Sequence, residues 1–366
     1  MTPLSEVLNR RHLPALDGLR AVAVGIVMVY HAGFTAISGD LGVTAFFVLS
    51  GFLITWLLLK EQDRNGRISL RSFYIRRSLR IFPAYFVFVG ISWALDLALG
   101  DPWELGALIS AATYTINYRN ALGGHDGPIA HAWSLAVEEQ FYLIWPLLLI
   151  AFLRSGRLRS GLVAIIVGVC AWRTLLFLGF RVPDHYVYNA FDTRFDSLAI
   201  GCLMAVLALS PRFVHAAPRL ARRAWYPIPV ILAILFSRDH IGREWHHSLG
   251  YTVDSVLVAV VIIQLLQLSS GPGWKWLNSR LAVWIGAISY PLYLWHGWGL
   301  GLADNVTRSD IRWLNLIVGF GLSFAIASAS YYGLEKHFLK LKDRLSRGAA
   351  VGQVLGQPVP ERSSQS

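Results

Sequence analysis

Residues 43–59 read VTAFFVLSGFLITWLLL, an apolar run that contains no charged side chain. A helix of this length covers about 26 Å at 1.5 Å per residue, close to the ~30 Å hydrocarbon core of a bilayer. Comparable runs occur at 135–153, 249–268 and 314–334. Because these runs are continuous rather than alternating, they predict membrane-spanning helices.

The composition of the whole chain agrees with a membrane protein. Its 366 residues are 55% hydrophobic and 15% charged, with a mean hydropathy of +0.48, whereas soluble domains carry about 25% charged residues. The net charge of +11 does not indicate a nucleic-acid partner here, because the basic residues lie mainly in loops between the apolar runs. Cys170 and Cys202 both fall inside such runs, so neither a disulfide framework nor a metal site is expected.

We predict an all-α, polytopic helix bundle in the inner (plasma) membrane, with about ten transmembrane helices and both termini cytoplasmic. The moderately apolar stretch 104–118 is assigned to an external re-entrant or interfacial helix, because a span there would move the basic segment 154–159 outside, against the positive-inside rule. The membrane domain is expected over 1–341, followed by a basic and then disordered cytoplasmic tail over 342–366. The expected spans are roughly 17–36, 41–59, 79–99, 135–153, 161–180, 195–210, 225–237, 250–268, 282–302 and 313–334.

The first span carries two ionisable residues on one face. Arg20 and His31 are eleven residues apart, which corresponds to three turns plus about 20° and ~16 Å along the axis. Arg20 is expected near the cytoplasmic surface and His31 in the outer half, buried. A histidine at that depth is often only an interhelical hydrogen-bond partner, but intramembrane ionisable residues also mark functional sites.

The start of the third span is rich in arginine. Arg77 and Arg80 are three residues apart and project from one helix face at the predicted cytoplasmic end. Anchoring by the positive-inside rule explains part of this charge. Guanidinium groups also bind phosphate in a bidentate manner, so a phosphorylated cytoplasmic ligand is the sharper hypothesis.

The fourth span begins with polar residues at its predicted outer end. Ser134 and Glu138 share a helix face, and Glu139 follows directly. One carboxylate can be a first-turn residue favoured by the helix dipole, and the other should point into the bundle, where it could orient an imidazole. The residues alone do not decide which of the two faces the site.

Further candidate binding residues lie near the C-terminal end of the chain. His296 is expected in the outer half of its span, together with Tyr293 and Trp295, while Glu335 closes the last span near the cytoplasmic face. The arginines thus collect on the inside and the acid or base groups on the outside. A cytoplasmic acyl-coenzyme A fits this arrangement, because its long pantetheine arm separates its phosphates from its thioester.

The chain resembles the acyltransferase 3 family of membrane acyltransferases from Leu13 to about Leu341. The matching segments are LPALDGLRAVAVGIVMVYHAG, GVTAFFVLSGFLIT, FYIRRSLRIFPAYF, WSLAVEEQFYLIWPLLL, RFDSLAIGCLMA, ISYPLYLWHG and YYGLEKHFLKL. The resemblance implies that Arg20 and His31 lie at the active centre and that Arg77 and Arg80 bind the donor. His337 stands where the family has proline, which weakens the role carried over to Glu335. The esterase-like domain of some relatives is not seen, so a stand-alone form is expected.

The resulting hypothesis is a membrane-bound O-acyltransferase that moves an acyl group from cytoplasmic acyl-CoA to a hydroxyl of an extracytoplasmic or membrane-associated carbohydrate, as in polysaccharide modification. Acyl-CoA, in the first place acetyl-CoA, serves as co-substrate with no tightly bound cofactor. His31 acts as general base, Glu138 or Glu139 orients it, and transfer is either direct or through an acyl-histidine. Alternatives are O-acylation of a glycosylated metabolite such as a macrolide, a transporter or flippase, and a structural partner in polymer assembly. Oligomeric state, acyl length and acceptor are left open. The residues assigned to substrate binding are Arg20, Arg77, Arg80, Ser134, Tyr293, Trp295, His296 and Glu335.

Overall fold

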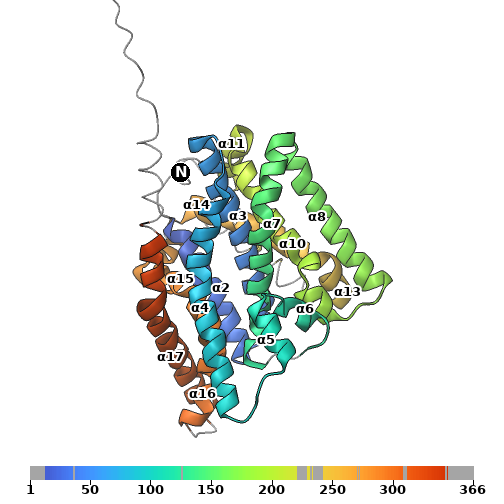
Figure 1. Cartoon of the computed structure of the whole chain (residues 1–366). Helices are drawn as coiled ribbons and strands as arrows, with labels where there is room; N and C mark the ends of the chain where they lie inside the picture. Colours follow the sequence, from blue (N-terminus) through green and yellow to red (C-terminus); the bar gives the residue numbers. More distant parts are fainter. Residues whose placement is uncertain are drawn as a thin grey trace, which may run out of the picture.

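The computed structural model describes residues 13–35, 38–124, 127–220, 229–230, 233, 242–269, 271, 273–307, 311–342 and 344. These residues form helices and connecting loops, and no strand occurs among them. The expected all-α bundle is therefore confirmed for this part of the chain. The longer helices run side by side in Figure 1, and the short helices α5 and α6 lie in the lower half of the view.

The first half of the chain supplies most of the long helices. They are α2 (Pro14–His31), α3 (Gly39–Asn65), α4 (Leu70–Ala98), α5 (Leu105–Ala112), α6 (Ile116–Ala121), η1 (Gly127–Ala132), α7 (Trp133–Ser155), α8 (Leu158–Thr174) and η2 (Leu175–Gly179).

The second half adds shorter helices and the last long ones. They are α9 (Asp184–Asn189), α10 (Phe191–Ala208), α11 (Pro211–Leu220), α13 (Arg243–Trp245), η3 (His246–Gly250), α14 (Tyr251–Leu268), η4 (Lys275–Asn278), α15 (Arg280–Ala287), α16 (Ser289–Thr307), α17 (Arg312–Ser330) and η5 (Tyr331–Glu335).

Six helical segments of the described chain are long and apolar enough to cross a membrane. They comprise residues 39–65, 70–98, 129–155, 158–179, 243–268 and 312–342. The count of about ten spans and the cytoplasmic position of both termini stay predictions. The span expected at 225–237 falls almost entirely outside the described residues, as does the tail beyond residue 344.

Two expected spans have different boundaries in the structure. The span at 17–36 ends at His31, because Gly33 adopts a left-handed conformation (φ 87°) that terminates α2. The span at 282–302 consists of α15 and α16, divided at Ile288. Pro291 lacks the N–H that would continue the helix across this point. The stretch 104–118, excluded from the spans, contains α5 and the start of α6.

Helices α3 and α10 form the centre of the bundle through close backbone contact. A Cβ atom at Gly51 of α3 would collide with the Leu198 carbonyl of α10, and one at Gly201 of α10 would collide with the Val48 carbonyl of α3. Small residues permit this close approach. In a bilayer the hydrophobic effect does not drive helices together, so van der Waals packing between closely spaced backbones stabilises their association. Of the most apolar part of α3, 72% is buried inside the protein, against 17% for 312–342. Helix α17 therefore lies at the periphery.

Candidate functional site

One cavity between the helices is lined by most of the polar residues that the sequence singles out. It encloses about 790 Å³ of empty space, a volume that includes the part open to the exterior. Helix α2 contributes Arg20, α4 contributes Arg77 and Arg80, and α3, α7 and α16 complete the wall. Its lining is Arg20, Val43, Phe46, Phe47, Ser50, Leu53, Arg77, Arg80, Ile81, Ser134, Leu135, Glu138, Glu139, Tyr142, Ser289, Tyr290 and Tyr293.

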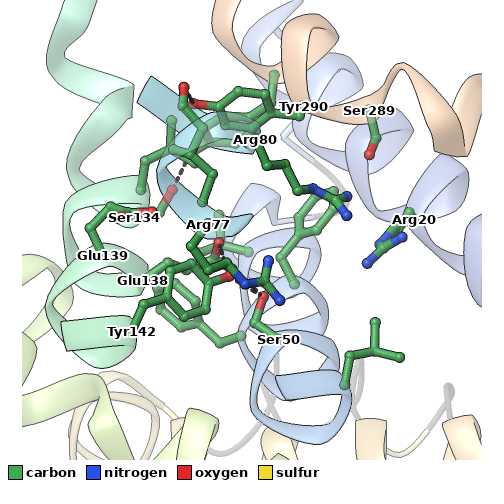
Figure 2. A pocket seen from close by; sticks show the side chains of 17 residues that line it. Arg20, Ser50, Arg77, Arg80, Ser134, Glu138, Glu139, Tyr142, Ser289 and Tyr290 are labelled. Carbon is green, nitrogen blue, oxygen red and sulfur yellow. Dashed lines mark hydrogen bonds between the residues drawn. The ribbon is translucent and has the colours of Figure 1, made fainter. Parts of the chain in front are cut away.

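The three arginines extend into this cavity from two helices (Figure 2). Arg20 makes an ion pair with Asp17 at 3.0 Å, one turn earlier on α2. Arg77 lies over the ring of Tyr142, with its guanidinium carbon 4.8 Å from the ring centre. Among the described residues, neither Arg77 nor Arg80 has a hydrogen-bond or ion-pair partner. The cavity therefore presents guanidinium N–H donors that an anionic ligand could occupy.

Glu138 is fixed by two hydroxyl donors beside the arginines. Ser50 Oγ donates to its Oε1 at 2.7 Å, and Tyr142 donates to its Oε2 at 3.1 Å. Glu139 lines the same cavity, and its Oε1 is buried without a hydrogen-bond partner in the described chain. Helical spacing brings Glu138 and Tyr142 together, since they are four residues apart on α7. Of the two carboxylates, Glu138 is thus the one held in place.

This arrangement differs from the predicted separation of charges. From the sequence, the arginines are expected at one end of the site and the carboxylates at the other, with a carboxylate orienting His31. In the structure Glu138 and Glu139 line the cavity that also contains Arg77 and Arg80. The hydrogen bonds of Glu138 go to Ser50 and Tyr142 rather than to His31. The difference arises because α4 and α7 pack so that Arg77, about two turns into α4, lies beside Glu138, between one and two turns into α7.

His31 lies away from the lining of this cavity, at the last residue of α2. The expectation of a buried His31 is wrong, because the residue is exposed where α2 ends. Its Nδ1 is 3.0 Å from the Val27 carbonyl and 3.2 Å from Nε2 of His296. His296 itself is buried, with 1% of its surface exposed. Arg20 and His31 therefore belong to different parts of the site, joined by one helix.

Tyr293 connects the two parts. Its hydroxyl lines the arginine cavity and donates to the His131 carbonyl at 2.8 Å, so Ser134 Oγ, 2.6 Å away, must donate to it. Its backbone carbonyl lies 2.7 Å from Nδ1 of His296. Tyr293 thus forms part of the cavity wall and also contacts His131 and His296.

Two of the predicted binding residues, Trp295 and Glu335, are buried outside the cavity lining. The Trp295 ring is buried and packs edge-on against Phe88, with 5.1 Å between ring centres. Its Nε1 has no hydrogen-bond partner among the described residues. Glu335 is buried in η5, accepts from Ser330 Oγ at 3.3 Å and interacts electrostatically with Arg80. Neither residue lines the cavity.

Sequence reasoning missed four of the polar lining residues, Ser50, Tyr142, Ser289 and Tyr290. Tyr290 donates to the Ile81 carbonyl at 3.0 Å and so joins α16 to α4 next to the arginines. Ser50 has a recognisable signal, since a hydroxyl beside Gly51 stands in the middle of the otherwise apolar run 43–59. The described residues contain no cluster of histidine, cysteine and acidic side chains suited to a metal ion.

The chain is similar in sequence to acyl-transferring proteins. A family profile described as an acyltransferase domain matches residues 13–332. The peptidoglycan O-acetyltransferase OatA of Listeria monocytogenes is 33% identical over 351 residues, covering 89% of this chain and 56% of that protein. A Staphylococcus aureus protein provisionally assigned as an O-acetyltransferase is 33% identical over 353 residues, covering 90% of this chain and 58% of that protein.

A third relative also has the name of an O-acetyltransferase. A Bacillus subtilis protein provisionally assigned as a peptidoglycan O-acetyltransferase is 30% identical over 357 residues, which cover 90% of this chain and 55% of that protein. The chain therefore spans less than two thirds of the length of the curated relatives it matches. No solved structure matches it.

Proposed function

Since this chain belongs to the acyltransferase 3 family, we propose that it transfers an acetyl group from acetyl-CoA to a hydroxyl of a cell-envelope carbohydrate across the plasma membrane. The match to residues 13–332 covers the whole described helix bundle except its last turns. The names of the Listeria and Bacillus relatives favour a peptidoglycan sugar as acceptor.

The observation that carries the choice of donor is the set of arginines at the cavity. Arg77 and Arg80 form no hydrogen bond or ion pair in the described chain, whereas Arg20 pairs with Asp17. Carboxylates act on them only at longer range, Glu138 and Glu139 on Arg77 and Glu335 on Arg80. Desolvated cations in a membrane are costly unless a counter-charge accompanies them. The phosphates of coenzyme A would supply that charge and accept the bidentate hydrogen bonds that guanidinium groups offer.

The shape of the site supports a long donor. His31 is the last residue of α2 and Arg20 lies in its first half, about 16 Å away by the helical rise. With its phosphates at Arg20, Arg77 and Arg80, the pantetheine arm of acetyl-CoA would extend along the cavity toward Tyr293 and Ser134. The thioester would then approach the histidines from the inside and the carbohydrate from the outside.

The transfer step itself requires one base. His31 would take the proton of the acceptor hydroxyl at a ring nitrogen as the hydroxyl oxygen forms a bond to the thioester carbonyl carbon. The carbon–sulfur bond then breaks, and the coenzyme A thiolate takes the proton from His31. The products are the acetylated sugar and free coenzyme A, and the histidine is regenerated. The exposure of His31 at the end of α2 supports access by the acceptor.

Purified full-length protein in lipid nanodiscs tests this proposal. It is incubated with isotopically labelled acetyl-CoA and soluble peptidoglycan fragments, while free thiol and acetylated fragments are measured. We expect thiol release that depends on the fragments, with one labelled acetyl ester formed for each thiol. Fragments that remain unmodified while acetyl-CoA stays intact would exclude this donor and acceptor pair. In sealed proteoliposomes, movement of fragments without loss of acetyl-CoA would instead indicate a transporter.

A further inference from the structure

Two imidazole rings meet at the end of α2. Nε2 of His296 lies 3.2 Å from Nδ1 of His31, and the ring centres are 4.9 Å apart. His31 is exposed and His296 is almost completely buried, so the pair consists of one accessible and one enclosed ring. A hydrogen bond between two imidazoles requires one nitrogen to donate and the other to accept.

A neighbouring carbonyl group determines which ring nitrogen of His296 donates a hydrogen bond and which accepts one. A carbonyl oxygen can only accept, so the Tyr293 carbonyl at 2.7 Å from Nδ1 requires an N–H on that nitrogen. A ring this deeply buried in an apolar bundle is neutral and carries a single proton. The proton is on Nδ1, and Nε2 of His296 is therefore an acceptor directed at His31.

The neighbours of His31 likewise determine which of its ring nitrogens carries the proton. Its Nδ1 faces two acceptors, the Val27 carbonyl at 3.0 Å and Nε2 of His296 at 3.2 Å. Nδ1 must therefore carry the proton, shared between both acceptors. The lone pair is left on Nε2, which has no hydrogen-bond partner among the described residues. A neutral imidazole with an unoccupied Nε2 is the form that can accept a proton.

We propose that His296 is the positioning residue of His31 in acyl transfer. It accepts the Nδ1 proton of His31, holds the tautomer with the lone pair on Nε2, and stabilises the imidazolium that forms when Nε2 takes the acceptor's proton. His296 thus does what the sequence analysis assigns to an acidic residue. This inference rests on the proposed function, because it concerns the base of that reaction.

Other neighbours are less suited to this role. The hydrogen bonds of Glu138 are made to Ser50 and Tyr142. His131 packs against His296, with 4.9 Å between ring centres, but its Nε2 lies 3.1 Å from the Leu294 carbonyl. The Val27 carbonyl also accepts from Nδ1 of His31 and favours the same tautomer. It belongs to the same helix as His31, however, and does not connect the ring to another helix. His296 is the neighbour that joins His31 to α16, which also carries Tyr293 of the cavity wall.

A matched pair of variants tests the proposal. His296→Gln presents an amide oxygen at about the position of Nε2, whereas His296→Met has a similar length and no strong acceptor. We expect kcat for acetyl transfer to fall about 10- to 100-fold in His296→Met, as part of the 10²–10⁴-fold contribution of a general base, with KM for acetyl-CoA unchanged. His296→Gln should recover most of this loss.

Controls separate positioning from folding and from the proposed function. Trp298→Phe removes a different hydrogen bond of α16, the one to Ser92 at 2.8 Å, and should retain wild-type kcat. Thermal unfolding and acetyl-CoA binding are measured for each variant, and His296→Phe replaces His296→Met if the latter does not fold. Equal kcat in the Gln and Met variants, whether high or low, would overturn the role of His296. An inactive wild-type protein would instead overturn the proposed function.

Discussion

The guanidinium carbon of Arg77 lies 4.8 Å from the centre of the Tyr142 ring, and the hydroxyl of that tyrosine donates to Glu138 at 3.1 Å. The arginine is thus positioned by a ring face, while the nearby carboxylate accepts from the hydroxyl of the same ring. This arrangement leaves the N–H groups of Arg77 without a partner among the described residues, in a cavity shared with Arg20 and Arg80.

Replacement of Arg77 tests this anion site. In Arg77→Gln the loss of a charge-assisted hydrogen bond, about 1.5–3 kcal/mol, should raise the Kd for acetyl-CoA roughly 10- to 100-fold. Arg77→Lys should recover only part of the affinity, because an ammonium group does not reproduce the planar fork. Isothermal titration of acetyl-CoA into the detergent-solubilised protein measures the Kd of both variants. Arg76→Gln is the matched control, since Arg76 pairs with Glu61 at 2.9 Å and does not line the cavity. Equal loss in Arg76→Gln would contradict a localised site.

His31 should be required for the chemical step and not for donor binding. His31→Ala is expected to lower kcat by about 10²–10⁴-fold, the usual contribution of a general base, while acetyl-CoA still binds with wild-type affinity. His215→Ala provides a control with the same local geometry. Its Nδ1 lies 2.6 Å from the carbonyl of Pro211, four residues earlier, on the exposed side of α11. A His31→Ala protein that folds and retains transfer would remove His31 from the mechanism.

Glu138 should contribute to stability through its two donors. In Glu138→Ala, Ser50 loses its acceptor, whereas Tyr142 can still donate to Ser50 Oγ at 3.1 Å, so we expect a cost of about 1–3 kcal/mol for one unsatisfied buried group. Glu138→Gln retains one acceptor oxygen and should be affected less. Thermal unfolding of the three proteins in the same detergent provides the comparison. Glu139→Ala should be milder, because its Oε1 has no hydrogen-bond partner to lose in the described chain. The reverse order of stability would show that the observed hydrogen bonds do not control it.

A fully buried ion pair joins α8 to α10. Arg173 and Asp196 both have 0% exposed side chains and are 2.9 Å apart, and Arg173 also donates to the carbonyls of Thr193 and Ser248. Removal of one partner leaves an uncompensated charge, so Asp196→Ala should destabilise the protein by about 3–5 kcal/mol. The double variant Arg173→Met, Asp196→Leu should be less destabilised than Asp196→Ala. Unfolding in a titration with denaturing detergent measures the difference. Additive losses in the double variant would contradict the pairing.

Helix packing at the centre of the bundle should not tolerate a larger residue. Gly201→Val places its side chain against the Val48 carbonyl of α3, and we expect the folded yield in detergent to fall sharply. Gly168→Val is the matched control, because nothing lies within 4 Å of a Cβ atom at that helical position. Size-exclusion chromatography of both variants gives the result. Wild-type yield of Gly201→Val would show that α3 and α10 can separate without cost.

The amino-acid sequence by itself determined the class of structure. Uncharged runs such as 43–59 form helices in a membrane, because backbone groups in hydrocarbon must be hydrogen-bonded within a helix or a closed barrel, and a continuous apolar run lacks the alternation of barrel strands. Local spacing also placed Arg77 with Arg80 and Glu138 with Ser134 on common helix faces, and the structure brings all four to one cavity. Helix formation and the sharing of a helix face both depend on the geometry of a single helix, which can be inferred directly from the periodicity of the sequence.

The tertiary structure decided which helix faces meet. Sequence spacing could not reveal that α4 and α7 bring Arg77 next to Glu138, or that the neighbour of His31 is His296, 265 residues further along the chain. It also could not place the end of α2, where Gly33 leaves His31 exposed. Contacts between helices depend on packing between surfaces, including close approaches such as Gly201 against α3, and the packing of two surfaces is not encoded in the periodicity of either helix alone.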